Sequence, residues 1–142
     1  MKKCIGILLF LIVLLQSAVA EITCICGESP DFCECFVQVG DRGPVIKWLK
    51  MYLWRQGYME KEDIELKTVC FVEKEDYVEC KEAEMSEREI FSRWDEICID
   101  ETDMDDVFDR KMLKAVYAFQ KENRLPQTGV FDDETMTLLL WG

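Results

Sequence analysis

One short phrase occurs twice near the C-terminal end of this chain. Residues 106–116 read "DVFDRKMLKAV" and residues 129–139 read "GVFDDETMTLL". Each Val-Phe-Asp triplet is followed, five and eight positions after the Phe, by apolar residues: Leu113 and Val116, then Met136 and Leu139. Asp is a typical helix N-cap, so Asp109 and Asp132 are expected to begin two helices. The repeat therefore predicts two capped helices whose Phe residues turn into a core.

The first twenty residues have the pattern of a secretory signal peptide. Lys2 and Lys3 precede an apolar run from Ile5 to Leu15, and small residues end the segment at 18–20. The run is too short to span a bilayer comfortably. We expect a secreted, extracellular mature chain that begins near Glu21, has no membrane association after cleavage and is long enough for one core.

Cysteine content agrees with an oxidising compartment. The disulfide candidates are Cys24, Cys26, Cys33, Cys35, Cys70, Cys80 and Cys98. An odd number leaves one thiol that is either free or paired with another chain, so a covalent dimer is one outcome. The C-x-C pairs at 24–26 and 33–35 are more closely spaced than ligands of structural zinc sites. Disulfides are therefore favoured there, and no metal is expected.

Charge and the absence of histidine exclude several functions. The net charge is −12, and residues 59–106 carry nineteen acidic against six basic side chains. Nucleic-acid binding is disfavoured because it needs a basic face. No histidine is present, which removes the commonest general base and histidine-dependent nucleophiles and zinc sites. We expect neither an enzyme nor a cofactor, although paired carboxylates leave glycosidase-like chemistry as a remainder.

Residues 44–57 predict an amphipathic helix. Ile46, Leu49 and Leu53 share a face, Pro44 suits the first turn, Asp41 suits a position just before it, and Gly57 suits the end. The same helix carries three aromatic residues that could stack on sugar rings: Trp48, Tyr52 and Trp54. Apolar residues at helical spacing favour core packing for them, with ligand contact as the alternative.

The acidic segment contains its own structural signals. Residues 68–80 predict a β-hairpin whose Cys70 and Cys80 could form a local bridge. Ser86 and Glu89 have the spacing of a capping box at the start of a further helix, and Met85 and Ile90 that of a hydrophobic staple. Residues 100–106, "DETDMDD", lack the glycine and glutamate of an EF-hand loop, so a solvated acidic linker is expected.

Taken together, residues 40–58 and 105–140 resemble the peptidoglycan-binding-like domain. The matching positions of its first helix are Gly40, Gly43, Ile46, Leu49, Leu53, Gly57 and Tyr58. Those of its later part are Phe108, Ala115, Val116, Phe119, Gln120, Leu125, Thr128, Gly129 and Thr135. Lys50, Asp106, Asp109 and Met112 depart from the family pattern, with Lys50 replacing a usual Gln.

The resemblance implies a mainly α fold: a small three-helix module with a disulfide-bearing acidic insertion that contains a short β-hairpin and an extra helix. The expected organisation is a signal peptide at 1–20, a Cys-rich segment at 21–39 and the module at 40–142, interrupted at about 60–104. The prodomain of secreted matrix metalloproteinases has the same module. Its inhibitory Cys-Gly-x-Pro-Asp switch has a poor counterpart here in residues 26–31, where a disulfide cysteine beside an ordinary turn is the favoured interpretation.

Two functions follow from the resemblance. The first is non-catalytic binding of cell-wall glycopeptide or another polysaccharide, with Gln120 joining Trp48, Tyr52 and Trp54 as candidate contacts. Core packing is the favoured interpretation for all four. The second is regulation or capture of a basic extracellular protein or a protease, with the acidic insertion as the contact surface. The strong negative charge opposes encounter with an anionic wall, which weighs against the first.

Overall fold

The computed structural model describes residues 23–26, 33–75 and 77–142, with side chains from Phe36 onward. The predicted signal peptide at 1–20 lies outside the described residues. In chain order the elements are β1 Thr23–Cys26, β2 Cys33–Phe36, α2 Pro44–Arg55, η1 Lys61–Ile64, β3 Thr68–Glu73, β4 Tyr77–Glu82, α3 Glu87–Ser92, η2 Trp94–Glu96, α4 Arg110–Glu122 and α5 Asp133–Trp141. No helix in the described part is both long and apolar enough to cross a membrane.

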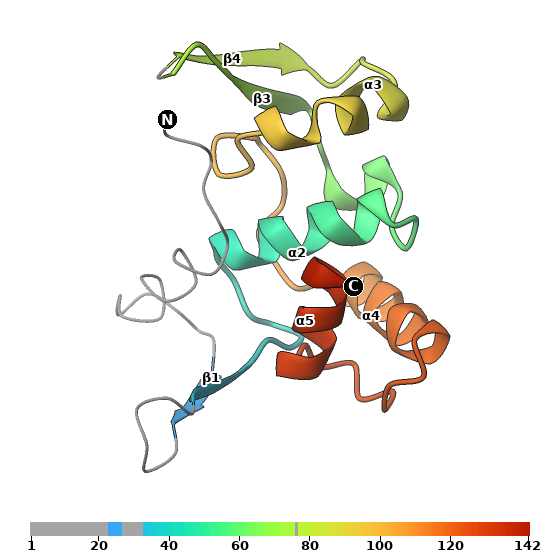
Figure 1. The fold of residues 1–142 in the computed structure, drawn as a ribbon. Coiled ribbons are helices and arrows are strands. Elements are labelled where there is room, and N and C mark those ends of the chain that lie inside the picture. The colour runs from blue at the N-terminus through green and yellow to red at the C-terminus, as the bar shows by residue number, and fades with distance from the viewer. Residues whose placement is uncertain (1–22, 27–32, 76) are drawn as a thin grey trace.

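Helix α2 lies in the middle of the molecule (Figure 1). The hairpin β3–β4 and α3 lie on one side of it, and α4 and α5 on the other. Ile46, Leu49 and Leu53 are fully buried, as their shared helical face predicts. Pro44 occupies the first turn, and the chain leaves the helix through Gly57, whose φ of 85° suits a residue without a Cβ.

The two Val-Phe-Asp phrases bind the same segment, residues 37–43, which leads into α2. Val37 and Phe131 exchange two backbone hydrogen bonds, of 3.0 and 2.8 Å. Phe108 accepts from the Gly40 N–H at 3.0 Å and donates to the Asp41 carbonyl at 2.9 Å. The two Phe rings are buried and pack edge to face with centroids 6.3 Å apart. The repeated phrase thus places two aromatic rings together beneath one strand-like segment.

Both aspartates of the repeat cap helices, as predicted. The Asp109 carboxylate accepts from the Met112 N–H at 2.9 Å and begins α4. The Asp132 carboxylate accepts from the Thr135 N–H at 2.8 Å and begins α5. Helix α2 differs, because Gly43 is its N-cap and has no side chain to donate or accept. Asp41 instead accepts from the Gln38 N–H at 2.9 Å and shapes the turn before the helix.

The predicted hairpin and capping box are confirmed. Strands β3 and β4 pair antiparallel with Cys70 opposite Cys80, and these two form a disulfide. Ser86 accepts from the Glu89 N–H while the Glu89 carboxylate accepts from the Ser86 N–H, so α3 begins with a reciprocal cap. Strand β3 is also bridged on its other edge, by Ile97 and Asp103.

The expected fold class is wrong. The described residues contain four α-helices and two antiparallel two-stranded sheets, which is not clearly a three-helix module. The acidic insertion is not looped out, because Ile64, Val69, Phe71 and Ile90 are completely buried in the same cluster as α2 and α4. The acidic residues described in this segment are exposed or half-buried, while many of its apolar residues enter the shared core. The composition of the segment alone does not show which of its residues are buried.

The acidic linker at 100–106 is also only partly solvated. Thr102 is fully buried, and its hydroxyl donates to the Cys98 carbonyl at 2.9 Å and accepts from the Cys70 N–H at 3.2 Å. Asp103 accepts from the N–H groups of Lys67 and Thr68, and Met104 is buried. These contacts attach the segment to β3.

Strands β1 and β2 pair antiparallel, with Cys24 opposite Cys35 and Cys26 opposite Cys33. The side chains of these four cysteines lie outside the described part, so their predicted bridges stay a prediction, as does a covalent dimer. Cys98 is disulfide-bonded. Its backbone also joins the hairpin, since its N–H donates to the Cys70 carbonyl at 2.7 Å.

Lys50 is a charged side chain buried within α2. It is fully inaccessible, and its Nζ lies 2.9 Å from Asp105 Oδ2 and 3.7 Å from Asp109 Oδ2. A buried ammonium is tolerated only when paired, and here two carboxylates supply the partners. The ion pairs tie the centre of α2 to the residues that begin α4.

Replacing Lys50 should strongly destabilise the protein. Lys50→Ala is expected to lower the free energy of unfolding by about 3 kcal/mol, because it removes a buried partner and leaves a cavity. Lys50→Met retains the aliphatic stem and should lose less. Urea unfolding followed by tryptophan fluorescence would measure both. Lys114→Ala on exposed α4 is the control, expected within about 0.5 kcal/mol of the parent, and an equal loss in both variants would contradict the assignment.

Candidate functional site

The aromatic residues of α2 that were considered for ligand contact lie in the interior. Trp48 and Trp54 are 8% and 2% exposed. Their indole N–H groups donate to Asp100 at 3.1 Å and Glu87 at 3.0 Å. Partial burial raises the pKa of the Asp100 carboxyl above its ordinary value. Both tryptophans therefore occupy core positions and attach the 87–100 region to α2.

Tyr52 is half-buried rather than open to solvent. Its ring packs edge to face on Trp94, with centroids 5.1 Å apart. Trp54 packs in the same edge-to-face way on Phe91, with centroids 4.6 Å apart. These contacts attach the α2 aromatics to neighbouring elements of the protein. Contact with a ligand at these positions stays an untested prediction.

Gln120 holds the turn between α4 and α5. It is fully buried, and its Nε2 donates to the Val130 carbonyl at 3.0 Å and to Thr135 Oγ1 at 3.2 Å. Its Oε1 accepts from the Gly129 N–H at 3.0 Å. Each end of the amide thus has partners, and the side chain fixes the position of α5 relative to α4. The structure places Gln120 as a positioning residue beneath the surface.

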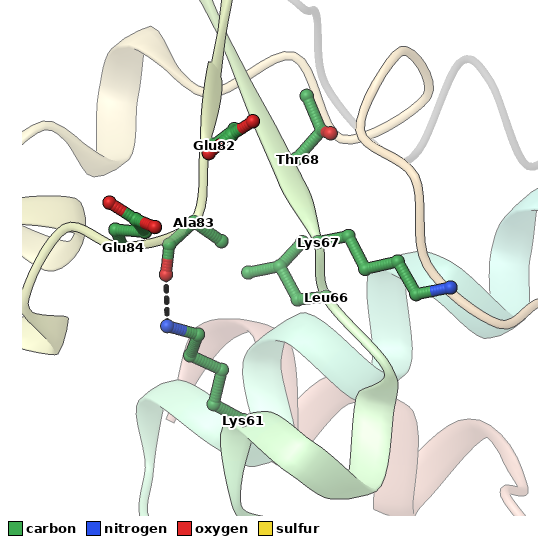
Figure 2. Close-up of a pocket in the computed structure, with 7 residues that line it drawn as sticks. All are labelled: Lys61, Leu66, Lys67, Thr68, Glu82, Ala83 and Glu84. Carbon is green, nitrogen blue, oxygen red and sulfur yellow. Dashed lines mark hydrogen bonds between the residues drawn. The ribbon is translucent and has the colours of Figure 1, made fainter.

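One surface hollow, of about 400 Å³, lies in the acidic insertion (Figure 2). It is lined by Lys61, Leu66, Lys67, Thr68, Glu82, Ala83 and Glu84. Lys61 reaches across it from η1 and donates to the Ala83 carbonyl, while the Lys67 side chain points away (Figure 2). The Lys61 ammonium in this hollow is thus already hydrogen-bonded to the backbone, and Glu82 and Glu84 lie at the rim of the hollow.

A second hollow, of about 390 Å³, lies against α5 and is lined by Leu125, Asp133, Glu134, Thr137 and Leu138. Trp141 follows Glu134, Thr137 and Leu138 at seven, four and three residues, which places it on the same helical face. Its side chain is 66% exposed. We call this surface the α5 face: Leu125, Asp133, Glu134, Thr137, Leu138 and Trp141.

The α5 face combines the group types that sugars need. An exposed indole offers a flat apolar surface, and two leucines extend the apolar floor. The carboxylates of Asp133 and Glu134 accept hydrogen bonds, while the Thr137 hydroxyl donates and accepts. Within the described ranges, no group of three or more His, Cys, Asp or Glu side chains is arranged to hold a metal ion.

Comparison with known families points to the same part of the chain. Residues 98–139 match the family described as "Putative peptidoglycan binding domain". The family is described as one of binding domains, which are not catalytic by themselves. The match confirms the resemblance for this segment, although it does not include residues 40–58. No curated protein and no solved structure matches the chain significantly.

Trp141 is not among the contact residues that the sequence patterns predict. Its signal was available, because residues 134, 137, 138 and 141 have the spacing of one helical face. Its exposure could not be predicted from the sequence, because a tryptophan that follows three leucines fits a core position equally well. The neighbouring Leu139 is 1% exposed, whereas Trp141 is open to solvent.

Gln120 and Gln127 provide a matched test of the turn. Gln120→Leu should lower the free energy of unfolding by about 2 kcal/mol, because it leaves the buried Gly129 N–H without a partner. Gln127→Leu, at an exposed position of the same turn, should have little effect. Urea titration of the two variants measures the difference. Similar stabilities would show that the amide does not hold the turn.

Proposed function

We propose that this protein is a secreted, non-catalytic module that binds cell-wall glycopeptide or a related polysaccharide through the α5 face. One observation supports this most. All residues that line the α5 hollow fall inside the segment that matches a peptidoglycan-binding family, and the exposed Trp141 lies two residues beyond that segment. The extracellular location is supported by the signal-like first twenty residues and by the Cys70–Cys80 bridge.

The binding mode follows from the chemistry of the surface. A sugar ring stacked on Trp141 would bury the apolar face of the indole while its hydroxyl groups donate to Asp133 and Glu134. The same carboxylates could pair with an amino group of a peptide cross-link. Because the hollow is shallow and open, several sugar residues would bind along the helix rather than one in a deep cleft.

Removal of the exposed indole tests the proposal. Trp141→Ala should weaken retention on insoluble peptidoglycan roughly tenfold, which corresponds to about 1.4 kcal/mol. Tyr77→Ala is the matched control, because Tyr77 is 62% exposed but lies on β4, outside the family match. Co-sedimentation at two salt concentrations gives the measurement.

Three outcomes are informative. Loss in Trp141→Ala alone supports the α5 face as the contact surface. Equal retention of the parent and both variants would show that the contact surface for the polysaccharide is not the α5 face. No retention of the parent at either salt concentration would refute polysaccharide binding of this kind.

A second candidate function is the capture of an extended basic peptide or protein, for which the outer edge of β4 is the supporting observation. Strand β4 pairs only with β3 in the described part, and its Tyr77 and Val78 are exposed. Free strand edges accept added strands, and the flanking Glu79 and Glu82 favour a cationic partner.

Val78→Pro would remove an outward N–H from this edge and should abolish capture of an oligolysine–valine peptide in a fluorescence anisotropy assay. Exposed Val39→Pro, outside the hairpin, is the comparison. Unchanged binding by Val78→Pro would exclude the edge as a docking site.

A further inference from the structure

We propose that the ligand is specifically an anionic polysaccharide and that the exposed face of α4 is a second contact surface for it. This inference rests on the proposed function, since it names the ligand class of the same binding module. The surface consists of three cations and one aromatic residue, and we call it the α4 stripe: Arg110, Lys114, Tyr117 and Lys121.

The α4 stripe is continuous along one side of the helix. Its members follow one another at four, three and four residues, the spacing of a single helical face. All four are exposed, whereas Met112, Val116 and Phe119 on the opposite side are buried. From Arg110 to Lys121 the stripe is roughly 16 Å long at the usual helical rise. Arg124 follows directly and is also exposed.

The cations of the stripe have no ion-pair partner among the residues that the structure describes. In the described part, none of its three cations lies within ion-pair distance of a carboxylate, despite 29 acidic residues in the chain. Lys111 does reach Asp63 at 3.7 Å, but from a different side of α4. The nearby Glu122 accepts from the Tyr58 hydroxyl at 2.8 Å.

The helix dipole does not explain the position of Arg110, although it does favour Lys121 in the last turn. The N-terminal end of a helix is the positive end of its dipole, so Arg110 in the first turn is unfavourable there. Helix α4 has no acidic residue in its first turn, while α5 has Asp133 and Glu134 at the equivalent positions. An unfavourably placed Arg110 in a row of cations without ion pairs is better explained by an anionic ligand.

Tyr117 adds a rigid aromatic surface in the middle of the stripe. It is 40% exposed, and its ring lies over Gly129. A methyl group built on Gly129 would come within 2.9 Å of Tyr117 Cζ and 2.6 Å of Leu113 Cδ1. The glycine, at φ 72°, thus allows the ring to lie close against the turn. A fixed ring between cations suits a sugar ring that carries acidic groups.

The fold separates this stripe from most of the negative charge. The hairpin β3–β4 and α3, which belong to the acidic segment, lie on the far side of α2 from α4 (Figure 1). Charges further apart than about 8 Å are largely screened at physiological ionic strength. A polysaccharide would therefore meet the stripe as a local basic surface. A nucleic-acid duplex, with its denser charge and larger footprint, would also meet the acidic remainder of a protein of net charge −12.

Neutralisation of the stripe tests the proposal. The variant Arg110→Gln/Lys114→Gln/Lys121→Gln should bind polygalacturonate or dextran sulfate at least tenfold more weakly than the parent. The matched control, Lys67→Gln/Lys74→Gln/Arg88→Gln, changes the net charge equally at exposed positions of the acidic segment and should lose less than twofold. Titration calorimetry with these two polymers distinguishes carboxylate from sulfate groups, and neutral dextran gives the charge-independent baseline. Binding of the parent should fall with added salt.

Each result has a distinct consequence. If the stripe variant binds normally while Trp141→Ala does not, the inference is overturned and the proposed function stands. Equal losses in the stripe variant and its control would mean that only net charge matters, which also overturns it. Tighter binding of duplex DNA than of either polymer would contradict the ligand class. If no polysaccharide binds the parent, the proposed function is refuted, and the inference that rests on it is refuted with it.

Lys114→Gln alone changes one exposed side chain and should leave the protein folded. It should show part of the loss of binding that the triple variant shows.

Discussion

The ion pairs of buried Lys50 are the interaction on which the rest of the structure depends. They connect the central helix to Asp105 and Asp109, and Asp109 is also the residue that caps α4. Because the ammonium has no access to water, the segment that begins α4 must stay against α2 for the charge to be tolerated. Lys50 and Asp109 are both departures from the family pattern that the sequence resembles, and the structure shows that they lie together.

This constraint also positions the proposed binding surfaces. Helix α4 is fixed at its start by the Lys50 ion pairs and near its end by Gln120, which bonds the turn leading to α5. The two outward surfaces, the α4 stripe and the α5 face, therefore belong to one rigidly held pair of helices. A site that is preorganised in this way loses little conformational entropy when a polymer binds. The acidic side of the molecule, beyond α2, is left to provide solubility or a separate contact.

Local features were predictable where chemistry acts between near neighbours in sequence. The caps at Asp109 and Asp132, the capping box at Ser86 and the bridge between Cys70 and Cys80 all follow from spacing alone. The fold class was not predictable, because burial of the acidic segment depends on partners distant in sequence. Phe71 and Ile90 belong to a segment of high charge, and only the folded structure shows that they are part of the common core. Burial of the α2 aromatic residues follows the core packing that their helical spacing favours, whereas ligand contact at these residues stays a prediction.

The sequence by itself determined the capped starts of three helices, the hairpin, the strong negative charge and the absence of histidine chemistry, because these depend on residue type and short-range spacing. It also indicated a resemblance to a binding-domain family, which the match of residues 98–139 confirms for that segment. Tertiary structure confirmed that Trp48 and Trp54 are interior, and it alone decided that Trp141 is exposed. It likewise decided that a protein of net negative charge carries a basic helix face. The exposure of a side chain and the charge around it depend on which elements pack together, and this packing joins residues far apart in the chain.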